Sequence, residues 1–590
     1  MLFLMDSTHK IIKIIDNQML MFNLDNLDIP IKEFIDPENG DSSHKFPQHA
    51  CLFDGDIIRL NDYRSESLGN KPETRSSTPY ELITSTIRSN VLVGYFSTSQ
   101  QVKFGKTSSG STIYQITPFN PVLPYFLVSY GGKQTGKLIV TFKFKEWTKG
   151  LPRGEIVQVI GPYDVENLIP TLQYNYQTNR KECKLKPNTN PLEASVHRTE
   201  ITECVFSIDP FGCIDIDDAM SWSQTDTTYN IKIHIAQPTY WITESDLMER
   251  AKYAFSTLYQ DPYKPNSNLW GDQITKASSL LAGVKRPSYT MEFIIEKQNG
   301  KIKSFNHYPS WVTNSYAVDY ESCLEIPVIN KLYTITQQIA ETNISDTHEL
   351  VSYWMIMANH YLGENEKLKQ LNVPYRVTKT NDKIFNSISH IIDLDVAKAF
   401  DNMKMDSAIY SIDDSDNFHA GLNIKNYIHF TSPIRRMADS LIHWCLTYDI
   451  NFKTLLTTHS FDFQLINILD KRTKKFHNQI KFLTAIDNLK LQGTDTIELD
   501  GWVYDTTGNR WMIYFKQLGF VRVKMWDFKF NYLQEEKNLE KKVGEYFVKN
   551  EKQKSSNTIF CGDKLRFSVC RKPGFLPKEK ILIVPLLNLI

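Results

Sequence analysis

Apolar and polar residues alternate in several short segments of the chain. KLIVTFKFKEW (137–147) alternates apolar residues with Thr and Lys, and LPRGEIVQVIG (151–161) follows after a turn. ECVFSID (203–209) and YNIKIHIAQP (229–238) have the same period, as does the aromatic segment GWVYDTTGNRWMIYFKQLGFVRVKMW (501–526). A period of two is typical of half-buried strands, so these segments predict β structure at both ends of the chain and within its middle.

Other segments have the period of a helix. Apolar residues recur at helical spacing near 245–260 and 347–370, and again after Ser432 in HFTSPIRRMADSLIHWCL. Residues 450–490, with DKRTKKFHNQIKFL, predict a basic helical connection. The order along the chain is therefore β, then mixed α and β, then β.

Short strands with lysines and aromatics in the first third favour small β-barrels of the OB or cold-shock kind. Such barrels often bind single-stranded nucleic acid by stacking and phosphate contact, although a barrel that binds nothing fits this segment equally well. The segments at 61–80 and 537–557 are polar and predict a loop and a poorly packed insertion.

Length, charge and cysteine content narrow the class. A chain of 590 residues is too long for one core and predicts several domains. Net charge is zero, but residues 501–590 hold 17 Lys and Arg against 9 Asp and Glu, which favours an anionic partner or a solvated basic face. Eight scattered cysteines contain no C-x-x-C pair, and no apolar run reaches eighteen residues, so we expect a reducing compartment and no membrane span.

The segment FSIDPFGCIDIDDAM (206–220) concentrates four carboxylates, those of Asp209, Asp215, Asp217 and Asp218. Like charges repel strongly in a poorly solvated site. Hard divalent cations relieve that repulsion, and oxygen ligands favour Mg²⁺, with Mn²⁺ as an alternative. Mg²⁺ on a few carboxylates usually acts on phosphates. A solvated acidic loop and a structural calcium site are the other interpretations.

The segment from His429 to Leu446 predicts an amphipathic helix with Ser432 as N-cap and Pro433 at its first position. Arg435 and Arg436 would then lie in the first turn, where the helix end already carries positive partial charge. That arrangement predicts a phosphate site. Pairing of the arginines with local acids such as Asp439 is the alternative.

These two motifs resemble the signature motifs of the RNB (ribonuclease II/ribonuclease R) exoribonuclease family. Their residues are most similar to those of its eukaryotic exosome-associated branch. IHIAQPT, VTNSYAVDYESC, LVSYWMIMAN, PYRV and FHAGL resemble further family segments in the same order. The chain is not long enough to include the N-terminal endonuclease domain of the exosome branch as well.

The resemblance implies a multidomain α/β and all-β fold: two N-terminal cold-shock/OB β-barrels, a mixed α+β RNB catalytic domain and a C-terminal OB-type (S1-like) RNA-binding barrel. The expected domains are a first barrel at 1–105, a second at 106–185, the catalytic domain with its helical connection at 195–490, and the C-terminal barrel at 495–590.

The resemblance also implies a hydrolytic 3′→5′ exoribonuclease that releases nucleoside 5′-monophosphates from single-stranded RNA. By motif, Asp209, Asp215, Asp217 and Asp218 become the metal-binding and catalytic carboxylates, and Arg435 contacts the scissile phosphate. The family's RNA contacts fall on three further residues: Arg436 beside the catalytic arginine, Tyr259 stacking on RNA, and Tyr320 clamping the terminal base.

Four positions depart from the family pattern: Tyr353 in the central helix, Gln237 after HIA, Leu281 in SSLLAGVKRP, and Met437 after the arginine pair. We still expect activity, since the aspartates and Arg435 are present. A non-catalytic RNA-binding protein with this fold is the first alternative, and a phosphodiesterase acting on DNA or small nucleotides is the second.

We expect the protein to work inside the cell, in the cytoplasm before nucleus or organelle. Single-stranded RNA is the expected partner, with no membrane and no obligate protein partner. Association with an exosome-like complex is an alternative.

Overall fold

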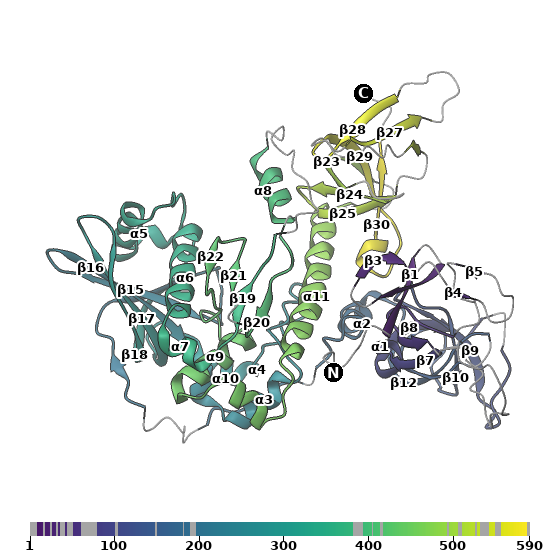
Figure 1. Cartoon of the computed structure of the whole chain (residues 1–590), viewed down its shortest axis with the longest axis horizontal. Helices are drawn as coiled ribbons and strands as arrows, with labels where there is room; N and C mark the ends of the chain where they lie inside the picture. Colours follow the sequence, from purple (N-terminus) through teal and green to yellow (C-terminus); the bar gives the residue numbers. More distant parts are fainter. Residues whose placement is uncertain are drawn as a thin grey trace, which may run out of the picture. The chain divides into compact units, whose positions relative to one another are not determined.

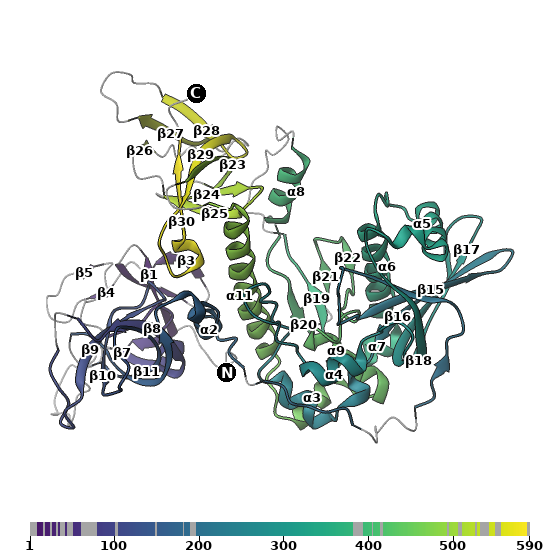
Figure 2. The same ribbon diagram turned by 180° about the vertical axis from the view of Figure 1, so that it is seen from behind.

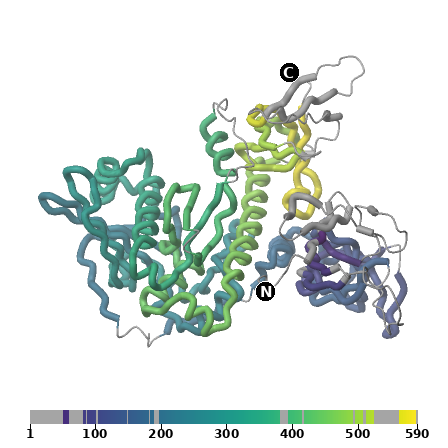
Figure 3. The backbone as a smooth tube through the Cα atoms, in the orientation of Figure 1, coloured from purple at the N-terminus to yellow at the C-terminus, as the bar shows by residue number. Residues whose placement is uncertain are grey.

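A computed structural model describes most of the chain, which divides into two compact units, Met1–Asn179 and Arg180–Ile590. Figure 1 labels the elements and Figure 3 traces the backbone. The described residues are 9–15, 18–23, 26–30, 34–35, 42–43, 51–60, 80–100, 104–147, 150–180, 182–188, 196–380, 393–403, 405–413, 417–491, 495–505, 510–524, 528–531, 542–548 and 556–586.

The first unit contains a five-stranded sheet in the order β3-β2-β1-β6-β7 and a closed barrel in the order β10-β12-β11-β8-β9. The sheet strands are β1 (His9–Ile15), β2 (Gln18–Asn23), β3 (Asn26–Pro30), β6 (Ile57–Leu60) and β7 (Tyr80–Thr84), with a separate pair β4 (Phe34–Ile35) and β5 (Ser42–Ser43). The barrel strands are β8 (Val91–Ser97), β9 (Thr112–Pro118), β10 (Phe126–Tyr130), β11 (Lys137–Glu146) and β12 (Arg153–Pro162), with helices α1 (Thr86–Ser89), η2 (Val165–Asn167) and α2 (Leu168–Asn175).

The barrel confirms the strands predicted at 137–147 and 151–161. Phe126 and Phe142 are fully buried inside it, their rings 5.0 Å apart. Its first strand begins at Val91, so the boundary expected at residue 106 lies inside the barrel, between β8 and β9. The predicted loop at 61–80 lies outside the described residues except for Tyr80.

The second unit begins with a six-stranded sheet in the order β13-β18-β14-β15-β16-β17. The long strand β18 pairs with β17 through its first part and with β14 through its end, so that Asp209 of β14 lies opposite Asp319. The strands predicted at 203–209 and 229–238 are confirmed. The bounds are β13 (Thr199–Glu200), β14 (Val205–Asp209), β15 (Asp218–Gln224), β16 (Thr228–Ala236), β17 (Lys285–Glu296) and β18 (Ile302–Asp319).

Helices pack on this sheet around one large core that includes Phe293, Trp354 and Leu441. Figure 1 and Figure 2 show α5, α6 and α7 beside the strands. The helices are η4 (Pro238–Trp241), α3 (Glu244–Ala251), α4 (Gly271–Ser278), η5 (Cys323–Glu325), α5 (Pro327–Ile339), α6 (Thr347–Gly363), α7 (Glu366–Leu371), α8 (Leu394–Met403), α9 (Met437–Tyr448), α10 (Phe452–Thr458) and α11 (Gln464–Asn488). Short strands β19 (Tyr375–Val377), β20 (Ile409–Ser411), β21 (Phe418–His419) and β22 (Ile424–Lys425) form two pairs.

Two predicted helices differ from those observed. The helix expected near 245–260 is shorter, because it ends at Ala251 and the chain then turns to pair with another segment. The helix expected at 347–370 is two helices, since Asn365 lies in the extended region and its side chain caps α7.

The helix expected from Ser432 begins instead at Met437, so Arg435 and Arg436 precede it. The main-chain N–H of Thr257 donates to the carbonyl of Arg435 (3.0 Å), and the N–H of Met437 donates to the carbonyl of Phe255 (2.7 Å). This strand-like pairing holds Arg436 extended, at φ −139° and ψ 124°. A distant segment therefore overrides the N-cap signal of Ser432.

The chain ends in a second β domain, preceded by the 25-residue helix α11, which confirms the helical connection. Its main sheet has the order β25-β24-β23-β29-β30 and a second sheet joins β26, β27 and β28. The bounds are β23 (Thr496–Asp505), β24 (Arg510–Phe515), β25 (Gly519–Lys524), β26 (Phe528–Asn531), β27 (Lys542–Val548), β28 (Ser556–Phe560), β29 (Lys564–Arg571), η6 (Pro577–Glu579) and β30 (Ile581–Pro585). Of the insertion predicted at 537–557, only β27 and the start of β28 are described. No helix within the described ranges has the length and apolar character needed to cross a bilayer.

Candidate active site

A tight turn between β14 and β15 carries the aspartate motif. The N–H of Cys213 donates to the carbonyl of Pro210 (3.0 Å), and Gly212 has a φ of +77°, which glycine adopts without strain. Phe211 at the tip is 91 % exposed. The turn thus projects outward, while the aspartates on either side of it lie at the ends of two neighbouring strands.

The carboxyl groups of Asp209 and Asp218 both have pKa values above the usual range for aspartate. Burial and the neighbouring carboxylate of Asp209 raise the pKa of Asp218 to about 7, against the opposing charge of Arg435. Burial also raises the pKa of Asp209 to about 6, although hydrogen bonding from Ser207 and the charge of Arg435 oppose it. One buried oxygen of Asp209, Oδ2, has no hydrogen-bond partner among the described residues. The carboxylates of Asp209 and Asp218 are therefore suited to binding a cation.

Asp217 is 2 % exposed and holds Arg435. Its Oδ1 accepts the main-chain N–H of Ile434 (2.7 Å) and its Oδ2 accepts Nε of Arg435 (3.0 Å). Arg435 also donates from Nη2 to Oγ of Ser432 (3.0 Å). Burial raises the pKa of Asp217 despite the adjacent guanidinium. The side chain of Arg435 is 48 % exposed, so the guanidinium is oriented by the protein and still accessible.

Arg436 is directed elsewhere. Its Nη2 donates to Oδ1 of Asp439 (2.8 Å), and its Nε forms a second bond to the same buried carboxylate. Asp439 also accepts the N–H of Ser432 (2.8 Å). Of the two arginines expected to form a phosphate site at a helix start, Arg436 instead forms the local ion pair that was the alternative interpretation.

Tyr259 lies beside Asp215 and α11. Its hydroxyl donates to Oδ2 of Asp215 (3.5 Å), and its main-chain N–H donates to Nε2 of His477 (3.1 Å). Burial lowers the pKa of His477 to about 4, so the imidazole is neutral at pH 7 and accepts this bond. The Tyr259 side chain is 39 % exposed, which leaves ring surface available.

Tyr320 follows directly after the β18 residue that pairs with Asp209. Burial, together with the charges of Asp218 and Asp209, raises its pKa to about 12. The ring stacks on His348 of α6 with centroids 3.8 Å apart and planes 18° apart. The structure thus brings Asp209, Asp218 and Tyr320 together. No local pattern indicates His348 or His477, because their partners are distant in the chain.

The available carboxylate oxygens suit Mg²⁺, which shares its coordination with water and phosphate, better than a metal that takes all of its ligands from the protein. No group of three or more His, Cys, Asp or Glu side chains in the described part of the chain converges on one metal position. Mg²⁺ is commonly bound by one or two carboxylates together with substrate phosphate and water. Asp209 and Asp218 meet that requirement, with Asp215 nearby; the donors of Ile434 and Arg435 already engage both oxygens of Asp217.

The four departures from the family pattern pack inside the protein. Gln237 accepts from Arg198 (2.9 Å) and donates to Oγ1 of Thr447 (2.9 Å), while Met437 is 1 % exposed. Tyr353 packs on the large core. Leu281 packs against the cluster that contains Ile216 and Ile434, so it extends an apolar layer beneath Asp217 and Arg435.

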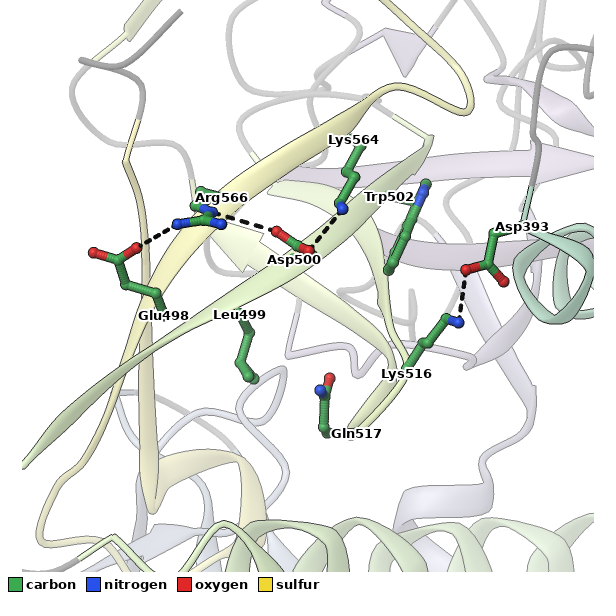
Figure 4. A pocket seen from close by; sticks show the side chains of 9 residues that line it. All are labelled: Asp393, Glu498, Leu499, Asp500, Trp502, Lys516, Gln517, Lys564 and Arg566. Atoms are coloured by element: carbon green, nitrogen blue, oxygen red, sulfur yellow. Dashed lines mark hydrogen bonds and ion pairs between the residues drawn. The ribbon is translucent and has the colours of Figure 1, made fainter.

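A hollow of about 400 Å³ lies on the C-terminal β domain (Figure 4). Its cations are paired: Lys564 with Asp500 (2.7 Å), Arg566 with Glu498 (3.0 Å) and Lys516 with Asp393 (2.6 Å). The residues that line it are Asp393, Glu498, Leu499, Asp500, Trp502, Lys516, Gln517, Lys564 and Arg566.

Helix α8 covers an adjoining aromatic face of the same β domain. Phe400 is 1 % exposed, and its ring lies 5.1 Å from that of Tyr504 and 5.9 Å from that of Phe520. Val396 and Trp502 belong to the same cluster. This aromatic face is therefore packed against protein, and RNA binding by the C-terminal barrel stays a prediction.

Comparison with known proteins identifies the middle of the chain. Residues 198–329 and 324–448 match the RNB domain. Ribonuclease R of Aquifex aeolicus is 23 % identical over 392 residues, which cover 52 % of this chain and 55 % of that protein. The chain thus matches about half the length of this relative. An identity of 23 % does not show to which branch of the family the chain is most similar. Its similarity to the exosome-associated branch therefore stays a prediction.

Solved structures share the fold over nearly the whole chain. Mycoplasma genitalium RNase R, in complex with ribose methylated single-stranded RNA, superposes with a TM-score of 0.72 at 16 % identity, covering 98 % of this chain and 100 % of that one. Yeast Ssd1, described as a pseudonuclease, gives a TM-score of 0.62 at 13 % identity, covering 92 % and 80 %. The mixed α/β, barrel-containing architecture is therefore that of RNase R.

Proposed function

This chain carries an RNB domain at residues 198–448, and from that premise we propose that it is a 3′→5′ hydrolytic exoribonuclease. It degrades single-stranded RNA to nucleoside 5′-monophosphates with the help of Mg²⁺ or Mn²⁺. The observation that carries the proposal is the pair Asp209 and Asp218, half-buried at the ends of the neighbouring strands β14 and β15, close enough to Tyr320 and Arg435 for their charges to interact.

The reaction is a hydrolysis. Water attacks the terminal phosphodiester, the bond from phosphorus to the 3′ oxygen of the preceding nucleotide breaks, and that oxygen takes up a proton. The products are a nucleoside 5′-monophosphate and an RNA shorter by one residue with a free 3′-hydroxyl. Bound divalent cations would supply charge neutralisation and activation of the attacking water.

Each side chain has a defined task. Asp209 and Asp218 would hold the cations, with Asp215 contributing from the turn. Arg435 stabilises charge on the phosphate, because Asp217 and Ser432 fix its guanidinium while leaving it half exposed. Tyr320, backed by His348, would stack on the terminal base, and Tyr259 would stack further along the strand.

The test is degradation of a 3′-labelled single-stranded RNA by the purified protein in Mg²⁺, with EDTA and a DNA oligomer of the same sequence as parallel arms. We expect mononucleotides from RNA in Mg²⁺ and none in EDTA. Intact RNA in Mg²⁺ and in Mn²⁺ would refute the proposal. Equal degradation of DNA would favour a general phosphodiesterase.

A second candidate function is RNA binding without cleavage. Two observations favour it: the described residues contain no group of three converging metal ligands, and a pseudonuclease shares the fold. In that case RNA would bind equally well in Mg²⁺ and in EDTA and stay intact in both. We prefer the nuclease, because an inactive protein gains nothing from two half-buried carboxylates that repel each other.

A further inference from the structure

The loop that presents Tyr259, residues 256–267, is held at its base by a side chain from outside the site. The loop closes on itself, since the N–H of Leu258 donates to the carbonyl of Ser267 (2.9 Å) and the N–H of Ser267 donates back to the carbonyl of Leu258 (3.0 Å). Arg180, the first residue of the second unit, reaches this base. Its Nη1 donates to the carbonyl of Ser256 (2.6 Å) and its Nη2 to that of Ser267 (2.7 Å).

The guanidinium therefore spans both arms of the loop. Its planar fork suits two separate acceptors in a way that a lysine ammonium does not. Among the described residues no carboxylate pairs with Arg180, and burial together with the nearby charge of Arg250 lowers its pKa to about 9. A half-buried cation without an acid is unfavourable by itself, so its contribution lies in the two carbonyls that it joins.

One of these contacts leads directly to the catalytic arginine. The carbonyl of Ser256 and the N–H of Thr257 belong to the same trans peptide group and point in opposite directions. Arg180 bonds this peptide on one side, and the main-chain carbonyl of Arg435 accepts from it on the other (3.0 Å). The position of Arg435 thus depends on a peptide that Arg180 fixes from behind.

We propose that Arg180 is a positioning residue of the active site, which fixes the base of the 256–267 loop and so sets where Tyr259 and the main chain of Arg435 lie. This inference rests on the proposed function for its effect on catalysis, but the positioning itself is a property of the fold. It predicts that loss of Arg180 impairs RNA handling through Tyr259 and Arg435, and by no route independent of them.

The first experiment reads position without activity. Tyr259 is replaced by 3-fluorotyrosine in the full chain, and its ¹⁹F resonance is recorded in the wild-type background and in Arg180→Lys and Arg180→Ala. We expect a single sharp line to shift and broaden in both variants. Arg198→Ala is the matched control, because Arg198 also donates to two main-chain carbonyls, those of Ser288 and Ser310, on other strands. A ¹⁹F line that Arg180→Lys leaves unchanged overturns the proposal.

The second experiment is a double-mutant cycle on RNA degradation. We expect Arg180→Ala to lower kcat/KM about tenfold or more when Tyr259 is present. When Tyr259→Ala is already present, the factor by which Arg180→Ala lowers kcat/KM should be at least threefold smaller. Arg198→Ala should lower kcat/KM by the same factor in both backgrounds. Equal effects of Arg180→Ala with and without Tyr259 refute the proposal. If Arg180→Ala does not fold, Arg180→Lys takes its place in the cycle. If the wild type does not degrade RNA but the Arg180 variants still displace the ¹⁹F line, the proposed function is refuted and the positioning role of Arg180 stands.

Discussion

Replacing Asp218 by asparagine should stabilise the metal-free protein at alkaline pH. The side chain keeps its shape but loses a charge that burial and Asp209 oppose. An aspartate in an unfolded chain has a pKa of about 3.9, whereas burial raises the pKa of Asp218 to about 7 in the folded protein. That difference is about three pH units at about 1.4 kcal/mol each, so the ionised group costs the folded state up to about 4 kcal/mol.

The sign follows from proton binding. Between pH 4 and 7 the folded state retains a proton on Asp218 that the unfolded state has released, so rising pH favours unfolding. The contribution of Asp218 to the free energy of unfolding is fully present below about pH 4 and is lost as the pH rises through about 7. Asp209, with a pKa of about 6, adds a smaller loss in the same direction. Asp218→Asn should therefore differ least from the wild type near pH 4 and exceed it in stability most at pH 8.

The assay is urea unfolding in EDTA at a series of pH values, followed by tryptophan fluorescence and compared with Asp226→Asn. Asp226 is an exposed carboxylate in the turn that follows β15, so its loss should change stability little at any pH. Adding Mg²⁺ at pH 8 should stabilise the wild type more than Asp218→Asn. A wild-type stability that is flat from pH 4 to 8, or an Asp218→Asn variant no more stable at pH 8, would refute the reasoning.

Three further predictions address the remaining site and the C-terminal barrel. Asp217→Asn should lower kcat by about 10²–10³-fold while RNA still binds, because Arg435 loses its charged partner; single-turnover cleavage and filter binding check this. Tyr259→Ala should weaken RNA binding in EDTA by about 1–3 kcal/mol, and Tyr259→Phe should restore it, since stacking needs only the ring. Phe400→Ala should cost about 3–5 kcal/mol at the contact between α8 and the barrel, visible as faster hydrogen exchange in α8, whereas unchanged exchange would contradict the packing.

Local pattern was sufficient where the structure is local. The alternation of apolar and polar residues predicted β14 and β16, because pairing with the neighbouring strands of the sheet preserves the two-residue period of each strand. The aspartate motif pointed to the correct turn for the same reason: Pro210 and Gly212 specify it within a few residues. The convergence of Asp209 and Asp218 then follows from the pairing of β14 with its neighbours, which no single segment contains.

Pattern failed where a distant segment decides the outcome. Ser432 and Pro433 are good residues for a helix start, yet the helix begins at Met437 because Phe255 and Thr257 pair with the chain just before it. Local propensities at a helix start amount to about 1 kcal/mol, and two main-chain hydrogen bonds in a buried strand-like pairing are enough to outweigh them.

The same pairing explains how the site separates two arginines that are adjacent in sequence. Arg435 ends a turn at 433–435 and faces Asp217, whereas Arg436 is extended and faces Asp439. Had both residues lain in the first turn of a helix, they would have been about 100° apart on one surface and could have shared a single anion. The change from turn to extended backbone instead directs one guanidinium to the accessible site and the other to the interior. The site is therefore built around a single arginine, and the segment at 255–257 that keeps the chain extended belongs to it as much as the carboxylates do.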